Sequence, residues 1–242
     1  MRLVLDTHTH TVASAHAYST VTEMARAAGE KGLELLAITD HGPALEDSSS
    51  KVHFMNYHIL PKEMFGVRML YGAELNILDF DGNVDLEEEI LKRLDICIAS
   101  FHTMCTTPGS IEENTAAYLK AMENPYVSII GHPEDGYVPI DFEALVKTAK
   151  EKKVLIELNN SSIKSAYYRL NTRENMIRLL NLCKKHEVNI SVGTDAHFSA
   201  SVGSFDEALG ILEEVDFPEE LVANTSAEKF LKLLEERKSF RK

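Results

Sequence analysis

Cysteine is scarce in this sequence, and its spacing is uninformative for pairing. The three cysteines are Cys97, Cys105 and Cys183, with no CxxC pair and no even set. This usage excludes a disulfide framework and is typical of a reducing compartment, so we expect a cytoplasmic protein. We interpret all three as small buried hydrophobes and none as a nucleophile.

Basic charge is also in short supply. The chain has 25 Lys and Arg against 38 Asp and Glu, a formal net charge of −13. Long nucleic acid and anionic membranes both require a basic face, so neither is an expected partner. Small anions remain compatible, because bound divalent cations would reverse the local charge without changing the residue count.

Long apolar runs and linker-like segments are missing as well. No stretch approaches the ~20 apolar residues of a membrane span, and the N-terminus is too short in apolar length for a secretory signal. No Gly/Ser-rich or Pro-rich linker and no internal repeat divides the chain. We therefore expect one domain over residues 1–242 and no membrane partner.

Seven short runs rich in Val, Ile and Leu predict β-strands. Most are apolar throughout and do not alternate, which is the pattern of strands buried on both faces of a parallel sheet. The predicted strands span residues 3–6, 33–39, 67–75, 94–100, 127–131, 154–158 and 188–193.

Helix-start signals lie between these runs. Capping-box patterns occur at 20–23, 85–88, 110–113 and 204–207. Asp141, Thr172 and Ser226 are further N-cap candidates, and Gly32 is placed to end the first helix in a left-handed conformation. Strand followed by helix, repeated seven times, predicts a single α/β, TIM-like barrel. An open doubly wound sheet is the alternative, but it would gather ligands at one switch point only.

Nine side chains that bind metals fall just after these predicted strands, and they include seven of the ten histidines. His8 and His10 end the first strand at alternate positions, so both can face one ion. A closed barrel would bring the other strand ends to the same pocket. Nine nitrogen and oxygen ligands exceed the needs of one ion and suit two or three ions of Zn, Mn or Fe. The candidate ligands are His8, His10, His16, His41, Glu74, His102, His132, Asp195 and His197.

Two aspartates could support these ligands from behind. Asp6 and Asp40 each lie close to a candidate histidine and could accept hydrogen bonds from ligand imidazoles. Solvation or capping explains them equally well.

Several polar residues are candidates for substrate contact. Some follow the sixth predicted strand, where an ordinary polar turn is the alternative interpretation. Others are basic and are equally explained as exposed charges. The candidates are Asn159, Asn160, Lys164, Arg169 and Arg173, with Ser161 and Ser162 beside them.

The connection from about residue 42 to 66 is longer than a barrel needs and could cover the site. We expect a short helix over 54–60 within it. Its histidines, His53 and His58, are interpreted as ordinary, partly exposed side chains, with an approach to metal as the alternative.

Taken in order, the motifs DTHTHTVASAHAYST, AITDHGP, GAELNI, SFH, GHP, ELNNSS and GTDAH resemble the PHP (polymerase and histidinol phosphatase) superfamily. The chain is most similar to its YcdX-like "probable phosphatases", and the resemblance covers nearly the whole sequence. It implies a distorted seven-stranded (β/α)7 barrel with three divalent metal ions, Zn in the first place and Mn or Fe as alternatives. It also implies a homotrimer.

The resemblance further implies how the ligands are divided. His8, His10, Glu74 and Asp195 would hold one ion. Glu74 would bridge to a second ion at His102 and His132. The third ion would lie among the three remaining histidines, which are His16, His41 and His197.

This centre predicts a metal-dependent phosphatase that acts on small phosphate monoesters. Three divalent ions would outweigh the two carboxylates and give an acidic protein a cationic pocket. Hydroxide activated by the metals would attack phosphorus directly, without a covalent intermediate. Phosphodiester or nucleic-acid cleavage is an alternative function, and a non-catalytic metal-binding protein is another.

Overall fold

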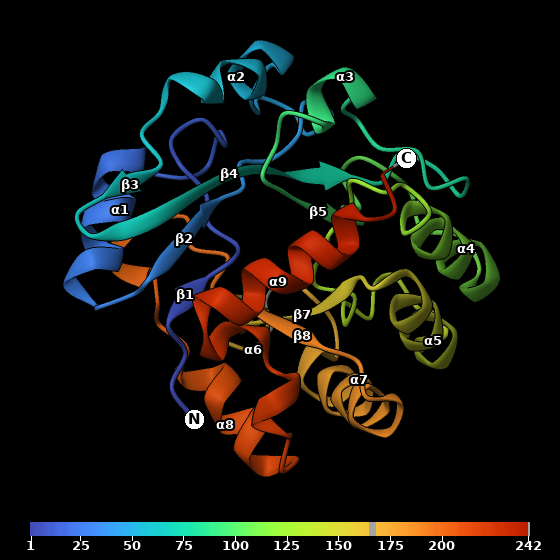
Figure 1. The fold of residues 1–242 in the computed structure, drawn as a ribbon. Helices are drawn as coiled ribbons and strands as arrows, with labels where there is room; N and C mark the ends of the chain where they lie inside the picture. Colours follow the sequence, from blue (N-terminus) through green and yellow to red (C-terminus); the bar gives the residue numbers. More distant parts are fainter. Residues whose placement is uncertain (165–167, 242) are drawn as a thin grey trace.

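The computed structural model describes residues 1–164 and 168–241, and they form a nearly closed barrel of seven parallel strands (Figure 1). Neighbouring strands follow the order β1-β2-β4-β5-β6-β7-β8. All seven predicted strands are confirmed, as is the single TIM-like barrel. The strands are β1 (Leu5–Asp6), β2 (Leu35–Ile38), β4 (Val67–Asn76), β5 (Ile96–Ser100), β6 (Ile129–Ile130), β7 (Leu155–Asn159) and β8 (Ile190–Gly193).

The barrel closes between β8 and β1 through separate hydrogen bonds. Thr9 and Ala196 form an isolated parallel bridge just beyond the two strands. Asp6, which is fully buried, accepts hydrogen bonds from the hydroxyl of Thr194 at 2.5 Å and from its amide at 3.1 Å. The first and last strands are thereby joined at the end of the barrel where the candidate ligands lie.

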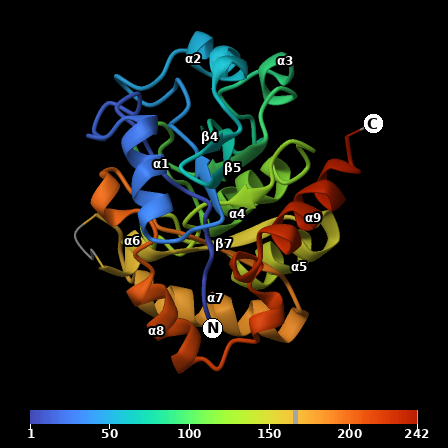
Figure 2. The same cartoon turned by 60° about the vertical axis from the view of Figure 1, so that its left-hand side comes forward.

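Helices alternate with the strands and surround the barrel (Figures 1 and 2). Among the described residues, none of them combines the length and the apolar character that crossing a bilayer requires. The α-helices are α1 (Val21–Glu30), α2 (Lys51–Met55), α3 (Glu88–Leu91), α4 (Ile111–Ala121), α5 (Phe142–Lys152), α6 (Asn160–Lys164), α7 (Thr172–His186), α8 (Asp206–Glu214) and α9 (Ala227–Lys238). Short 3-10 turns are η1 (Asn56–Ile59), η2 (Ser199–Ser201), η3 (Glu219–Leu221) and η4 (Ala223–Thr225).

The predicted helix starts were partly correct. Thr20 and Ser110 form complete capping boxes at the starts of α1 and α4. Asp141 and Ser226 accept the expected backbone hydrogen bonds at α5 and α9. Gly32 takes the predicted left-handed conformation after α1, with φ of +70°.

Three predicted caps were wrong, because the side chains or backbone found other partners. Asp85 accepts hydrogen bonds from Asn76 in place of capping α3. Ser204 accepts one from the Lys31 ammonium, and α8 begins two residues later without a side-chain cap. Thr172 is the first residue of α7 and not its cap.

The long connection contains α2 and η1, so the predicted helix over 54–60 is confirmed with an earlier start. It also contains β3 (Glu63–Met64), a short strand antiparallel to β4 that the sequence pattern did not predict. Phe65 and Gly66, both with positive φ, form the two-residue turn between these strands. The strand β3 escaped prediction because its two residues are too few to show an alternating pattern.

Helix α9 crosses the end of the barrel opposite the candidate ligands (Figures 1 and 2). Phe230 and Leu234 of this helix pack on the apolar residues inside the barrel, among them Leu5, Ile96 and Ile129. The interior is therefore filled from this end, and only the other end is left for polar side chains.

Candidate metal centre

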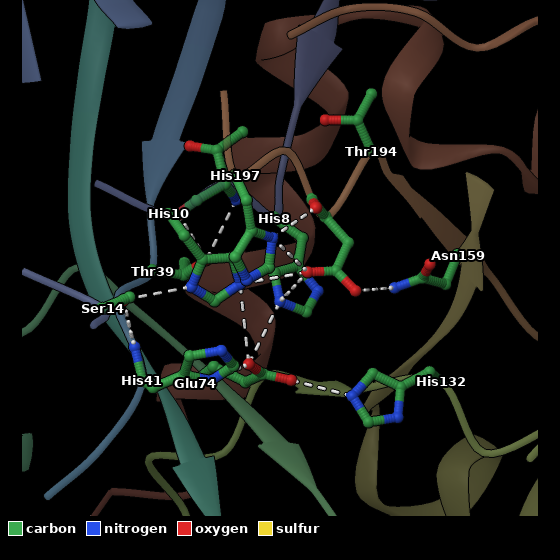
Figure 3. A network of polar contacts seen from close by, with 12 residues as sticks. His8, His10, Ser14, Thr39, His41, Glu74, His132, Asn159, Thr194 and His197 are labelled. Carbon is green, nitrogen blue, oxygen red and sulfur yellow. Dashed lines mark hydrogen bonds and ion pairs between the residues drawn. The ribbon is translucent and has the colours of Figure 1, made fainter. Parts of the chain in front are cut away.

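All nine candidate ligands lie together at the carboxyl ends of the barrel strands, where Figure 3 shows several of them pointing toward one another. Three follow β1, two follow β8, one each follows β2, β5 and β6, and Glu74 lies near the carboxyl end of β4. Most are buried. His16 is exposed, and His102 and His197 are half-buried. The barrel thus brings distant positions of the sequence into one cluster.

The carboxylate of Glu74 lies at the middle of this cluster. Its Oε1 atom is 2.9 Å from Nε2 of His132 and 3.3 Å from Nε2 of His102. Its Oε2 atom is 2.6 Å from Nδ1 of His41 and 3.4 Å from Nε2 of His8. Each oxygen therefore faces a different group of imidazoles, as a carboxylate that bridges two ions must do.

Asp195 lies on the other side of His8 and His10. Its Oδ1 atom is 3.1 Å from Nε2 of His10 and 3.7 Å from Nε2 of His8. Asp195 has φ of +54°, a conformation that costs energy in a non-glycine residue. The chain turns sharply here, which aims this carboxylate at the two histidines of the first strand.

Three imidazoles form the remaining part of the cluster. The ring of His16 lies 4.5 Å from that of His197 and 5.1 Å from that of His41, measured between centroids. The His10 ring lies 4.2 Å from the His41 ring and 4.3 Å from the His197 ring. His10 therefore lies between these three imidazoles and the group formed by His8, Glu74 and Asp195.

Several of these atoms are buried without a hydrogen bond. They include Nε2 of His8, His10 and His197, both ring nitrogens of His41, and Oε2 of Glu74. An unsatisfied buried polar atom costs about 1–3 kcal/mol, and here such atoms converge. A divalent cation satisfies imidazole nitrogens and carboxylate oxygens together, so the residues present fit a metal centre.

Hydrogen bonds behind the cluster fix how two of the imidazoles can bind. Nδ1 of His8 donates to Oε1 of Glu157 at 2.7 Å, and Nδ1 of His102 donates to Oδ1 of Asn76 at 2.6 Å. In this tautomer each Nε2 keeps its lone pair for an ion. Glu157 and Asn76 were missed as site residues, although the motifs ELNNSS and GAELNI contain them.

Neither predicted supporting aspartate contacts a ligand imidazole. Asp6 serves barrel closure, as described above. Asp40 is buried and accepts hydrogen bonds from the hydroxyls of Thr11 and Ser14. Nδ1 of His10 reaches Oγ of Ser14 at 3.3 Å, so Asp40 acts on this ligand only through the serine.

Charge in the cluster favours a bound cation. Burial alone would raise the pKa of Glu74, but the imidazoles of His102, His8 and His41 hold it well below its ordinary value. Burial is likewise outweighed at Asp195, where His8 above all lowers the pKa. Both carboxylates are thus ionised at neutral pH.

The His16 imidazole stays neutral at ordinary pH. The pKa of His16 is lowered to about 4 by burial and by the neighbouring His197 and His41. A neutral imidazole is the form that binds a metal ion, and it needs no deprotonation near pH 7.

Two predicted substrate-contact residues lie beside the cluster. Arg169 donates to Oγ of Ser162 at 2.5 Å and lies 3.4 Å from Oδ2 of Asp195, with its side chain 18% exposed. Asn159 donates to the same Asp195 oxygen at 3.2 Å. Arg169 therefore places a cationic group at the edge of the proposed ion sites.

The other candidates are elsewhere. Oδ1 of Asn160 accepts from the amide of Ala208 in the first turn of α8. Lys164 is exposed at the end of α6, and Arg173 forms a surface ion pair with Glu214. Ser161 is half-buried in α6, and no contact draws it to the cluster.

The histidines of the long connection do not join the cluster. Nε2 of His53 lies 3.2 Å from Oδ2 of Asp40, and His58 donates to the carbonyl of Met55. His53 nevertheless ties this connection to the base of the site through Asp40.

The chain is similar over nearly its whole length to proteins named as phosphatases. The chain is 51% identical over 234 residues to a protein of Clostridium novyi (strain NT) named "Probable phosphatase", which covers 97% of this chain and 95% of that one. A second protein with that name, from Acetivibrio thermocellus, is 48% identical and covers 98% of both chains.

A solved structure gives independent support for the barrel. The histidinol phosphate phosphatase of Lactococcus lactis, complexed with Zn, L-histidinol and phosphate, superposes with a TM-score of 0.64 at 18% identity. It covers 88% of this chain and 94% of that one. The family model described as "PHP domain" matches residues 6–239, and the chain belongs to the PHP family.

Proposed function

We propose that this protein is a metal-dependent phosphatase that hydrolyses small phosphate monoesters at a trinuclear centre. Residues 1–242 would act as one hydrolase domain. The position of Glu74 carries the proposal, because its two oxygens face separate groups of imidazoles, and Nε2 of His8 and both ring nitrogens of His41 beside it are buried without a hydrogen bond. The phosphatase relatives support the reaction class.

The ions would be held as three overlapping sets of ligands. His8, His10 and Asp195 would hold one ion with Glu74, and His102 and His132 would hold the second with the other oxygen of Glu74. His16, His41 and His197 would hold the third. Zinc is the first choice, because these are nitrogen and oxygen ligands and the Lactococcus lactis structure contains Zn; Mn and Fe suit the same donors.

When bound, the ions would supply Lewis-acid polarisation of a phosphate ester and a lowered pKa for water. Side chains of the protein would bind the substrate and position the ligands. Arg169 would bind a phosphate oxygen through its guanidinium, while Asn159 holds Asp195 in place. No cysteine is suited to act as a nucleophile, since burial raises the pKa of Cys105, the one near His102, to about 11.

A small substrate fits this environment better than a polymer. The net charge of −13 opposes long polyanions, and Arg169 lies next to Asp195 within the site. We propose a small phosphorylated metabolite as the substrate and a homotrimer as the assembly. The cytoplasm is the proposed location.

The test is a screen of the purified protein against phosphate monoesters and diesters, before and after chelation and with Zn, Mn or Fe restored. We expect hydrolysis of monoesters that chelation abolishes and metal restores. Preference for diesters would instead support a phosphodiesterase. Bound metal without hydrolysis of either class would support a non-catalytic metal-binding protein.

A further inference from the structure

Glu157 lies behind the ligand cluster, in the middle of β7, with 1% of its surface exposed. It belongs to none of the three proposed ligand sets. Its two oxygens nevertheless make hydrogen bonds to parts of two sets. A buried carboxylate is costly unless its oxygens are used in this way, so its position requires an explanation.

One oxygen fixes a ligand of the first proposed ion. Oε1 accepts a hydrogen bond at 2.7 Å from Nδ1 of His8, whose Nε2 faces Glu74 and Asp195. A carboxylate behind an imidazole selects the tautomer, orients the ring and makes its other nitrogen a stronger donor to a metal.

The other oxygen fixes the backbone of a ligand of the second proposed ion. Oε2 accepts from the amide of His132 at 2.8 Å and from Nδ2 of Asn159 at 3.2 Å. His132 has φ of +28°, in the region that non-glycine residues rarely occupy. The hydrogen bond from Glu157 holds this strained turn, which directs Nε2 of His132 to Glu74.

The backbone around Glu157 leaves room for this arrangement. A Cβ atom on Gly193 would lie 2.3 Å from Oε1 of Glu157 and 2.6 Å from Cβ of His8. Only glycine at this point of β8 lets the carboxylate and the imidazole meet. The contact is therefore built into the barrel by residues from three strands or strand ends.

We propose that Glu157 is a positioning residue that sets the affinity of two of the three ion positions, those of His8 and of His132. It does not act on the position formed by His16, His41 and His197. This inference rests on the proposed metal centre, but it does not require that the protein hydrolyse phosphate esters.

The test measures Zn²⁺ binding to the chelated protein by competition with a chromophoric chelator, together with the zinc retained per chain. In Glu157→Ala both hydrogen bonds are lost, and we expect zinc affinity to fall roughly 10–100-fold at two positions while the third is unchanged. In Glu157→Gln the amide satisfies only one of the two donors, His8 or His132, so we expect one position to weaken.

Asn224→Ala is the matched control. Asn224 is equally buried and joins β1 and β8 by hydrogen bonds to the backbone carbonyls of Leu5 and Val192, neither of which is a candidate ligand. It should lower the melting temperature of the metal-free protein without changing zinc affinity. Zinc affinities within about threefold of wild type in both Glu157 variants would overturn the inference, as would an equal loss at all three positions.

Hydrolysis is measured separately on the same preparations. Wild-type protein that binds zinc but cleaves no ester would contradict the proposed function and leave the role of Glu157 intact. Wild-type protein that binds no zinc would contradict both.

Discussion

Oε2 of Glu74 lies 2.6 Å from Nδ1 of His41, yet neither atom forms a hydrogen bond. Both are buried, and the carboxylate is ionised because neighbouring imidazoles lower its pKa. Two lone pairs that face one another in this way repel unless a proton or a cation lies between them. The local geometry thus favours an ion that Glu74 shares with the surrounding histidines.

Glu74→Ala should remove the group common to two proposed ion positions. We expect hydrolysis to fall by roughly 100-fold or more and zinc content to drop, with the barrel still folded because the damage is local. Initial rates on a phosphate monoester and circular dichroism check this. Glu46→Ala, an exposed glutamate in the long connection, is the control and should behave as wild type. Unchanged turnover in Glu74→Ala would exclude our assignment.

Ser14→Ala should weaken ion binding without touching a ligand. Ser14 accepts from Nδ1 of His10 and from the amide of His41, and donates to Asp40. Without this hydroxyl, His10 loses the hydrogen bond that orients its ring through Nδ1, and we expect zinc affinity to fall roughly 10-fold. Ser49→Ala, which removes a hydrogen bond to the carbonyl of Ala13 nearby, is the control. Equal zinc affinities in the two variants would refute the role of Ser14.

Glu134→Gln should change how stability depends on pH. Burial raises the pKa of Glu134 to about 7, although the charge of Arg169 opposes it. A raised folded-state pKa means that the unfolded chain ionises first. Wild-type stability from this group is therefore complete below about pH 4.5 and is lost as the pH rises toward 7.

The glutamine variant cannot ionise, so its stability should not show this loss. At pH 8 we expect it to be more stable than wild type by up to about 3 kcal/mol, and at pH 4 the two should agree. Urea unfolding of the metal-free proteins at both pH values measures the difference. A constant difference across this range would show that Glu134 does not titrate as described.

Arg237→Ala should destabilise the closed end of the barrel. The buried guanidinium donates to the carbonyls of Met122, Asn124 and Val127 in the connection between α4 and β6, and to that of Lys152 at the end of α5. Its loss leaves buried carbonyls unpaired, and we expect about 3–5 kcal/mol less stability. Lys238→Ala is the control. The Lys238 side chain pairs with Glu235 at the surface, so its removal should lower stability only slightly. Denaturant unfolding with comparable midpoints for the two variants would contradict this role.

The barrel could be predicted because its signals are local. Runs such as 94–100 and 188–193 are apolar, which indicates buried parallel strands. In a parallel barrel, the residues that follow the strands all lie at the same end. The nine clustered side chains could be predicted from the sequence for the same reason. The strand β3 could not be predicted, since its two residues are too few to show an alternating pattern.

Residues that support the ligands were harder to predict, because their partners are distant in the sequence. His8 and Glu157 are separated by 149 positions, and His102 and Asn76 by 26. Asp85 has the spacing of a helix cap, yet its carboxylate is bound to Asn76 across a loop. A local pattern cannot show which of two partners a polar side chain will find in the folded chain.

The most direct measurement is an anomalous difference map at the zinc absorption edge from crystals of the protein grown with Zn²⁺. We expect three peaks among the nine side chains, one of them between Oε1 of Glu74 and the imidazoles of His102 and His132, and one between His8, His10 and Asp195. A map with no peak in this cluster, or with zinc bound only at other places on the chain, would contradict the metal centre.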